Sequence, residues 1–81
     1  MRVSLRCFGL LKDHLPAEAV AGLLEISVRD EALVKDAVEA AGLPPDKVFA
    51  ILVDGAPGKL DQPLFDGSEV TLMPQFTGGS D

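Results

Sequence analysis

Polar and apolar residues alternate along two segments of the chain, at residues 2–8 and 24–28. Side chains of a strand point to its two faces in turn, so the pattern predicts two strands that are each buried on one side. In the first strand the inward side chains are Val3, Leu5 and Cys7, and the outward ones are Arg2, Ser4 and Arg6. A last strand is predicted over residues 70–73, and a short helical turn over residues 10–15.

The spacing of apolar residues changes after residue 30. Five of them fall on one helical stripe: Leu33, Val34, Ala37, Val38 and Ala41. Asp30 is suited to cap the start of this helix, and Gly42 is suited to end it. Residues 49–53 are continuously apolar, which predicts a strand that is central in the sheet and covered on both faces. The pair Leu64-Phe65 is interpreted as a short apolar anchor.

The order strand, strand, helix, strand, strand predicts an α+β fold with one main helix packed across a mixed sheet of four to five strands. This is the β-grasp, or ubiquitin-like, arrangement, in which the first and last strands lie side by side and parallel. We expect the domain to span residues 1–74. Residues 75–81, here called the tail, are expected to be flexible and carry Gly78-Gly79.

Composition narrows the function classes. The 81 residues suffice for one domain, and 13 acidic against 7 basic residues give a net charge of −6, which disfavours nucleic acid and anionic membranes as partners. A single cysteine and a single histidine exclude an iron–sulfur cluster, a cysteine-rich zinc site and most catalytic triads within this chain. We therefore expect no enzyme activity of its own and no bound cofactor. No apolar run is long enough to span a membrane or act as a signal peptide, which predicts a cytoplasmic location.

A few side chains invite chemical roles that compete with simpler ones. Cys7 is a candidate sulfur acceptor, but its place on the apolar face favours a buried small side chain. His14 is interpreted as a surface residue in a polar turn, and the sequences Asp54-Gly55 and Asp66-Gly67 as turns that need positive φ at glycine. For contact with a partner protein the candidates are Arg2, Arg6, Met73 and Phe76.

The tail offers the most specific chemistry. Five extended residues from Gln75 to Gly79 span at most about 17 Å, enough to enter a narrow tunnel in a partner. Glycine has no Cβ, so a carboxylate on Gly79 would be open to adenylation and conversion to a thioacid. Glycine and serine are also common in inert linkers, which is the competing interpretation.

Four segments together resemble the MoaD/ThiS sulfur-carrier family, which includes the small subunit of molybdopterin synthase. They are the opening strand at residues 3–8, residues 34–43, which the resemblance makes a helix starting near Val34, residues 51–55, and residues 64–74 with the following tail to Gly79. The last segment is similar to the family's closing "L-x-D-G-D-x-V-x-x-x-P-P-V-x-G-G". It departs from that pattern at Gln75, at Phe76, and in the added Ser80-Asp81.

The resemblance implies that Gly79 is adenylated and thiocarboxylated by a ubiquitin-activating-like enzyme that binds the ATP and magnesium. Gly78 and Thr77 would fit the partner's tunnel, and a larger synthase subunit or another sulfur-accepting enzyme would receive the sulfur, with a molybdopterin-type cofactor favoured over thiazole, an amino acid or tRNA. A peptidase would first cut between Gly79 and Ser80. The alternative is a non-conjugated ubiquitin-like binding module with an inert tail.

Overall fold

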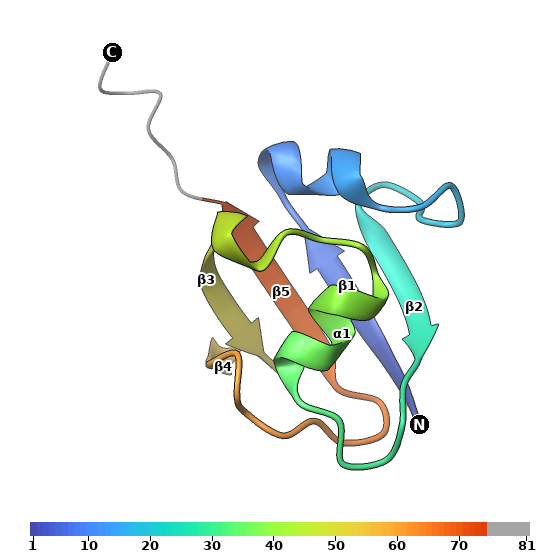
Figure 1. The fold of residues 1–81 in the computed structure, drawn as a ribbon, viewed down its shortest axis with the longest axis vertical. Helices are drawn as coiled ribbons and strands as arrows, with labels where there is room; N and C mark the ends of the chain where they lie inside the picture. Colours follow the sequence, from blue (N-terminus) through green and yellow to red (C-terminus); the bar gives the residue numbers. More distant parts are fainter. Residues whose placement is uncertain (75–81) are drawn as a thin grey trace.

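The computed structural model describes residues 1–74, which form a five-stranded mixed sheet with one main helix (Figure 1). The strands are β1 (Arg2–Cys7), β2 (Leu23–Ser27), β3 (Val48–Val53), β4 (Ala56–Pro57) and β5 (Glu69–Pro74). The helices are α1 (Val34–Ala40) and the short 3-10 helices η1 (Gly9–His14) and η2 (Pro45–Lys47). The predicted α+β, β-grasp arrangement is confirmed.

The central strand is β5, in the sheet order β2-β1-β5-β3-β4. It runs parallel to β1 from the pair Ser4–Glu69 to the pair Cys7–Leu72, and antiparallel to β3. The parallel pairing of the first and last strands is confirmed. The central position predicted for residues 49–53 is wrong, because the central strand is β5, which lies between β1 and β3. β5 thus joins the antiparallel pair β1–β2 and the antiparallel pair β3–β4 into one sheet.

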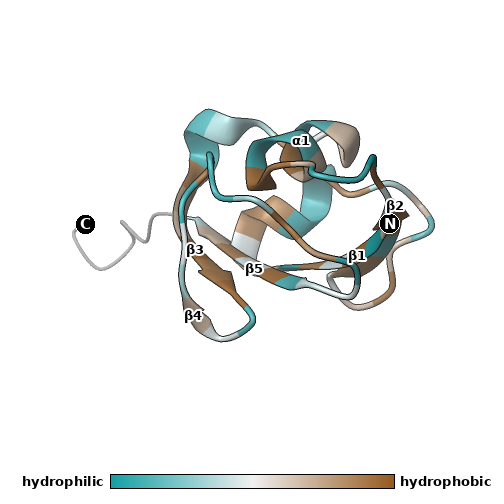
Figure 2. Cartoon of the chain, turned by 90° about the horizontal axis from the view of Figure 1, so that it is seen from below, coloured by the Kyte–Doolittle hydropathy of each residue, from teal (hydrophilic) through white to brown (hydrophobic). Residues whose placement is uncertain are grey.

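One face of the sheet is covered by α1, and Figure 2 shows the helix lying above the strands as a separate layer. The inward side chains of β1, Val3, Leu5 and Cys7, are at most 3% exposed. The buried core that they share with the helix and with β5 also contains Leu24, Val34, Ala37, Val38, Val70 and Leu72. Alternation in the strands and the helical stripe therefore meet in one apolar layer, as the sequence pattern predicts.

The helix α1 begins at Val34, so the start predicted at Asp30 is wrong and the start that the family resemblance implied is confirmed. Glu31 has a φ of 69°, in the left-handed region, which a continuing right-handed helix excludes. The helix is capped instead by Asp36, whose side chain accepts a hydrogen bond of 2.8 Å from the backbone N–H of Leu33. That bond and the guanidinium of Arg29 lower the pKa of the Asp36 carboxyl.

The strand β3 is covered on one face only, contrary to the prediction. A bulge between Val48 and Ala50 interrupts its pairing with β5, and the intervening Phe49 is 69% exposed. Beyond the bulge Ile51 and Val53 pack on the helix side, whereas Leu52 lies on the opposite side. A continuous apolar sequence thus belongs here to a strand with one uncovered face.

Both predicted turns are confirmed, with φ of 86° at Gly55 and at Gly67. Each preceding aspartate also serves the sheet, since Asp54 accepts a hydrogen bond from the N–H of Glu69 and Asp66 accepts one from the N–H of Arg2, both at 2.9 Å. Of the predicted apolar anchor Leu64-Phe65, only Leu64 is buried in the core, whereas Phe65 is exposed.

Candidate functional site at the end of the last strand

The point from which the chain continues into the tail is fixed by packing at Pro74. Gly9 lies against this proline with a φ of 59°, and a Cβ at Gly9 would stand 2.9 Å from the Pro74 Cγ. Glycine is required here both for the backbone conformation and for the close approach. The start of η1 therefore holds the end of β5 in place.

Arg2 and Arg6 lie exposed on the side of the sheet opposite α1, here called the open face. Their guanidinium groups pair within the chain, Arg2 with Glu25 at 3.1 Å and Arg6 with Glu69 at 3.4 Å. Neither residue is a free cation, so a partner that uses them must share them with these carboxylates. Their role in a partner interface stays a prediction.

A row of apolar side chains on the open face borders the end of β5. Met73 pairs with Ala50 across the sheet, and Leu52 pairs with Thr71. All three apolar residues are partly buried, and Phe8 follows in line from the open side of β1 with 44% exposure. Of this group, only Met73 is predicted from the sequence as a contact with a partner protein. The alternation over residues 2–8 places Arg2 and Arg6 outward and assigns Phe8 to the same side. This alternation was the signal from which Phe8 could have been identified as part of the open face.

The other singled-out side chains offer little chemistry. Cys7 is buried, and its burial raises the pKa of the thiol to about 11, which keeps the sulfur protonated and weakly nucleophilic at neutral pH. This confirms its interpretation as a small core side chain. His14 lies exposed at the end of η1, as predicted. Within residues 1–74 no three side chains of His, Cys, Asp or Glu are grouped so as to hold a metal ion.

The residues that the tail hypothesis needs lie outside the described part of the chain. They are Phe76, Thr77, Gly78, Gly79 and Ser80. Their predicted roles in the partner interface, the tunnel, thiocarboxylation and processing stay predictions. What the structure supplies is the strand end at Pro74, five residues before Gly79.

A protein-family model described as Mut7-C ubiquitin matches residues 1–79. The chain belongs to this family. The match covers the whole β-grasp unit of this Mut7-C ubiquitin chain and stops at Gly79, so that Ser80-Asp81 lie beyond it. None of the curated protein sequences matches the chain.

Solved structures similar to this Mut7-C ubiquitin chain include SAMP1 of Haloferax volcanii, a small archaeal modifier protein. It is 21% identical, and the match covers 98% of this chain and 100% of that one with a TM-score of 0.73. A putative subunit 1 of the molybdopterin converting factor from Pyrococcus furiosus is 22% identical, with a TM-score of 0.67 over 93% and 98%. These two similarities show the fold.

A third similar structure is the complex of subunits 1 and 2 of the molybdopterin-converting factor from Helicobacter pylori. Its matching chain is 27% identical to this one, and the match covers 98% of this chain and 100% of that one with a TM-score of 0.61. The resemblance to small ubiquitin-like proteins of this group, drawn from residues 3–8, 34–43, 51–55 and 64–79, is therefore confirmed. Within residues 1–74 no helix has the length and apolar character needed to cross a membrane.

Proposed function

We propose that this chain is a sulfur carrier whose Gly79 carboxylate, exposed by removal of Ser80-Asp81, is adenylated and thiocarboxylated by a partner enzyme and then donates sulfur. The acceptor we favour is a molybdopterin-type cofactor. The chain acts as a protein co-substrate, and ATP and magnesium bind to the activating partner. In this proposal the chain supplies the carboxylate and its partners supply the catalytic groups.

The main support is a Gly-Gly pair a short distance beyond the central strand of a β-grasp domain. The structural likeness to subunit 1 of the molybdopterin-converting factor adds to it, since that protein forms a complex with a second subunit. The family match that stops at Gly79 fits a functional unit that ends there. The apolar row around Met73 gives the larger partner a surface to contact beside the tail.

The proposed chemistry needs a peptidase, an activating enzyme, a sulfur donor and a sulfur acceptor, and no side chain of this protein. A peptidase hydrolyses the Gly79–Ser80 bond. The new carboxylate oxygen attacks the α-phosphorus of ATP and displaces pyrophosphate, and a hydrosulfide donor then attacks the acyl carbon and displaces AMP. The sulfur of the resulting thiocarboxylate attacks an electrophilic carbon of the acceptor and displaces a leaving group from it. Water then hydrolyses the acyl–sulfur bond, which leaves the sulfur on the acceptor as a thiol and restores the carboxylate of Gly79.

The deciding measurement is the intact mass of the chain recovered from its own cells under sulfur demand. We expect loss of Ser80-Asp81 together with the exchange of one oxygen for sulfur. A full-length, unmodified chain would contradict the proposal and favour the alternative, a ubiquitin-like module that binds its partner through the open face. That alternative rests on Leu52, Met73 and Phe8, which lie on the open face independently of the tail.

A substitution in the tail further distinguishes the sulfur-carrier function from the binding-module alternative. Gly79→Phe is expected to abolish thiocarboxylate formation, because a bulky side chain cannot enter a passage that glycine fits, whereas Gln75→Ala in the same tail should retain it. Both variants should unfold at the same urea concentration as the parent. Thiocarboxylate on the phenylalanine variant would defeat the carrier proposal.

A further inference from the structure

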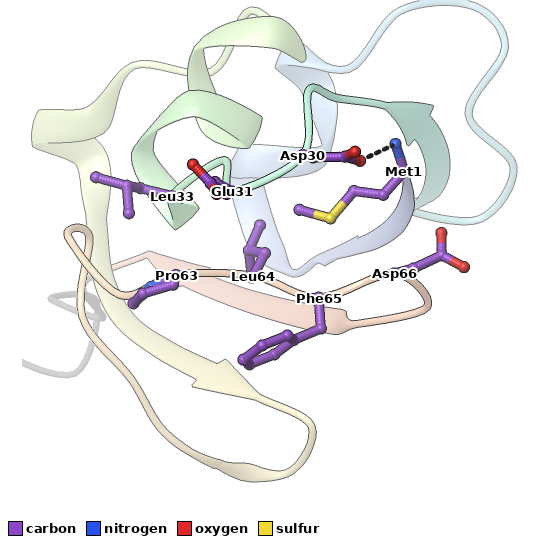
Figure 3. Close-up of a pocket in the computed structure, with 8 residues that line it drawn as sticks. All are labelled: Met1, Asp30, Glu31, Leu33, Pro63, Leu64, Phe65 and Asp66. Carbon is purple, nitrogen blue, oxygen red and sulfur yellow. Dashed lines mark hydrogen bonds and ion pairs between the residues drawn. The ribbon is translucent and has the colours of Figure 1, made fainter.

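An open hollow of about 460 Å³ lies between the loop before α1 and the loop before β5 (Figure 3). Its apolar lining comes from Met1, Leu33, Pro63, Leu64 and Phe65. Figure 3 shows these side chains grouped around one space, with Leu64 at its centre and the ring of Phe65 along one side. A hollow of this size accommodates one or two large apolar side chains.

The walls of the hollow are held by backbone pairing. Leu33 and Pro63 form a bridge between the two loops, and the N–H of Leu64 donates to the carbonyl of Ala32 at 2.9 Å. The N–H of Phe65 donates to the Ser68 hydroxyl at 3.0 Å, and the N–H of Ser68 donates back to the carbonyl of Phe65 at 2.9 Å. The loops are thus ordered before any ligand arrives, which lowers the entropic cost of binding.

Phe65 is 74% exposed despite this ordered surrounding. Its neighbour Leu64 fills the core, and adjacent residues in an extended segment point to opposite sides. The fold therefore presents an aromatic ring to solvent in a fixed position beside an apolar hollow. Aromatic side chains in such settings are typical anchors of protein interfaces.

Three carboxylates surround the apolar lining, from Asp30, Glu31 and Asp66. Among the residues of the described part of the chain that line the hollow there is no lysine or arginine, and the terminal ammonium of Met1 is 3.5 Å from Asp30. The two arginines closest in sequence are engaged elsewhere, since Arg2 pairs with Glu25 and Arg29 pairs with Asp36. The hollow thus has an apolar floor and a negative rim.

Glu31 holds a strained backbone at this rim, with a φ of 69° in a residue that carries a Cβ. A glycine would adopt that conformation without strain, so the carboxylate is present at a cost in stability. Strain of this kind in an exposed residue is consistent with a role in binding.

The hollow lies at the opposite end of β5 from the tail. It adjoins the loop that enters β5 at Glu69, whereas the tail leaves β5 at Pro74, and six residues of strand separate these ends by roughly 17 Å. In Figure 1 the loop before β5 and the N-terminus lie at the lower end of the sheet, and β5 points away from them. A protein bound at the hollow therefore leaves Pro74 accessible.

We propose that this hollow is a docking site for a partner protein segment that inserts an apolar side chain between Leu33 and Phe65 and flanks it with lysine or arginine. The basic residues face Asp30, Glu31 and Asp66. The negative rim disfavours a second copy of this acidic chain and an anionic lipid surface. This site is separate from the tail, so the proposal holds whether or not Gly79 carries sulfur.

Two synthetic octapeptides serve as probes in an NMR titration of the full chain, one alternating leucine with arginine and the other alternating leucine with glutamate. We expect the arginine peptide to shift the amide signals of residues 30–33 and 63–66 saturably, and the glutamate peptide to leave them unchanged. Phe65→Ala should weaken binding of the arginine peptide by about tenfold or more. Phe49→Ala removes a similarly exposed ring outside the hollow and should leave the affinity unchanged.

Glu31→Gly sharpens the test, because it removes a rim charge and also relieves backbone strain. We expect it to weaken the arginine peptide about two- to threefold at low salt while the protein becomes no less stable to urea. Shifts that spread over the acidic surface and are the same in Phe65→Ala would overturn the proposal. Equal binding of both peptides, or no shift at residues 30–33 and 63–66 with either, would also overturn it.

Discussion

The two faces of the sheet share the same strands but differ in how they are stabilised. On the helix face, Val3, Leu5 and Val70 are almost completely buried beneath α1. On the open face, Arg6 pairs with Glu69 while both stay about half exposed. Each strand therefore contributes alternately to an apolar core and to a surface of ion pairs and partly buried apolar residues.

This difference separates stability from recognition. Burial of apolar area provides most of the folding free energy, whereas exposed ion pairs contribute little. Residues of the open face are consequently free to serve a partner, as the row containing Leu52 and Met73 is proposed to do.

The largest effect is expected from Leu5→Ala on the helix face. Leu5 has 0% exposure in the centre of the core, and its truncation should lower the free energy of unfolding by about 2–5 kcal/mol. Urea unfolding of parent and variant, followed by circular dichroism, measures the difference. A loss below about 1 kcal/mol would mean that this face is not the principal source of stability.

A pH-dependent effect of intermediate size is expected from Cys7 on the same face. Burial raises the pKa of its thiol from 9.0 to about 11, so the unfolded chain releases this proton at lower pH than the folded one. The folded state should therefore lose up to about 3 kcal/mol as the pH rises from about 9 to about 11.

The measurement is the free energy of unfolding in urea across that pH range, compared with Cys7→Ala. The alanine variant lacks the thiol, so its stability should fall less steeply with pH than that of the parent. Parallel curves for the two proteins would contradict the assignment of this loss to the thiol.

The smallest effect is expected from Arg6→Ala on the open face. The pair with Glu69 is exposed to solvent, and its loss should cost less than about 1 kcal/mol. A double-mutant cycle with Glu69→Ala measures the coupling between the two side chains. If Arg6→Ala destabilised the protein as strongly as Leu5→Ala, the distinction between the faces would fail.

The sequence was sufficient to predict the elements whose pattern is set by local burial. Alternation over residues 2–8 identified β1 and the side chains it buries, and the stripe ending at Ala41 identified α1. Gly42 ends that helix as expected, with a φ of 78°. These patterns arise because each strand or helix packs one side on the same core.

The predictions that failed depended on contacts between distant parts of the chain. Asp30 has the chemistry of a helix cap, but Leu33 is held in an extended conformation by pairing with Pro63, thirty residues later. The bulge at Phe49 and the central place of β5 are likewise set by strand pairing that periodicity does not encode.

The candidate sites divide in the same way. Gly78-Gly79 was found because its chemistry is local to the tail. The hollow was missed because its walls come from two loops about thirty residues apart, although the adjacent pair Leu64-Phe65 contained a signal. Neighbouring side chains in an extended segment point to opposite sides, so the burial of Leu64 leaves Phe65 facing solvent.

The central position of β5 also has a consequence for how the chain folds. Its pairing with β1 joins residues more than sixty positions apart, and such distant contacts slow folding because a large loop must close first. A chain that ends before residue 69 lacks the strand that joins the β1–β2 pair to the β3–β4 pair. The sheet is complete only when β5 is in place, so the chain continues beyond Pro74 from a domain that already has all of its strands.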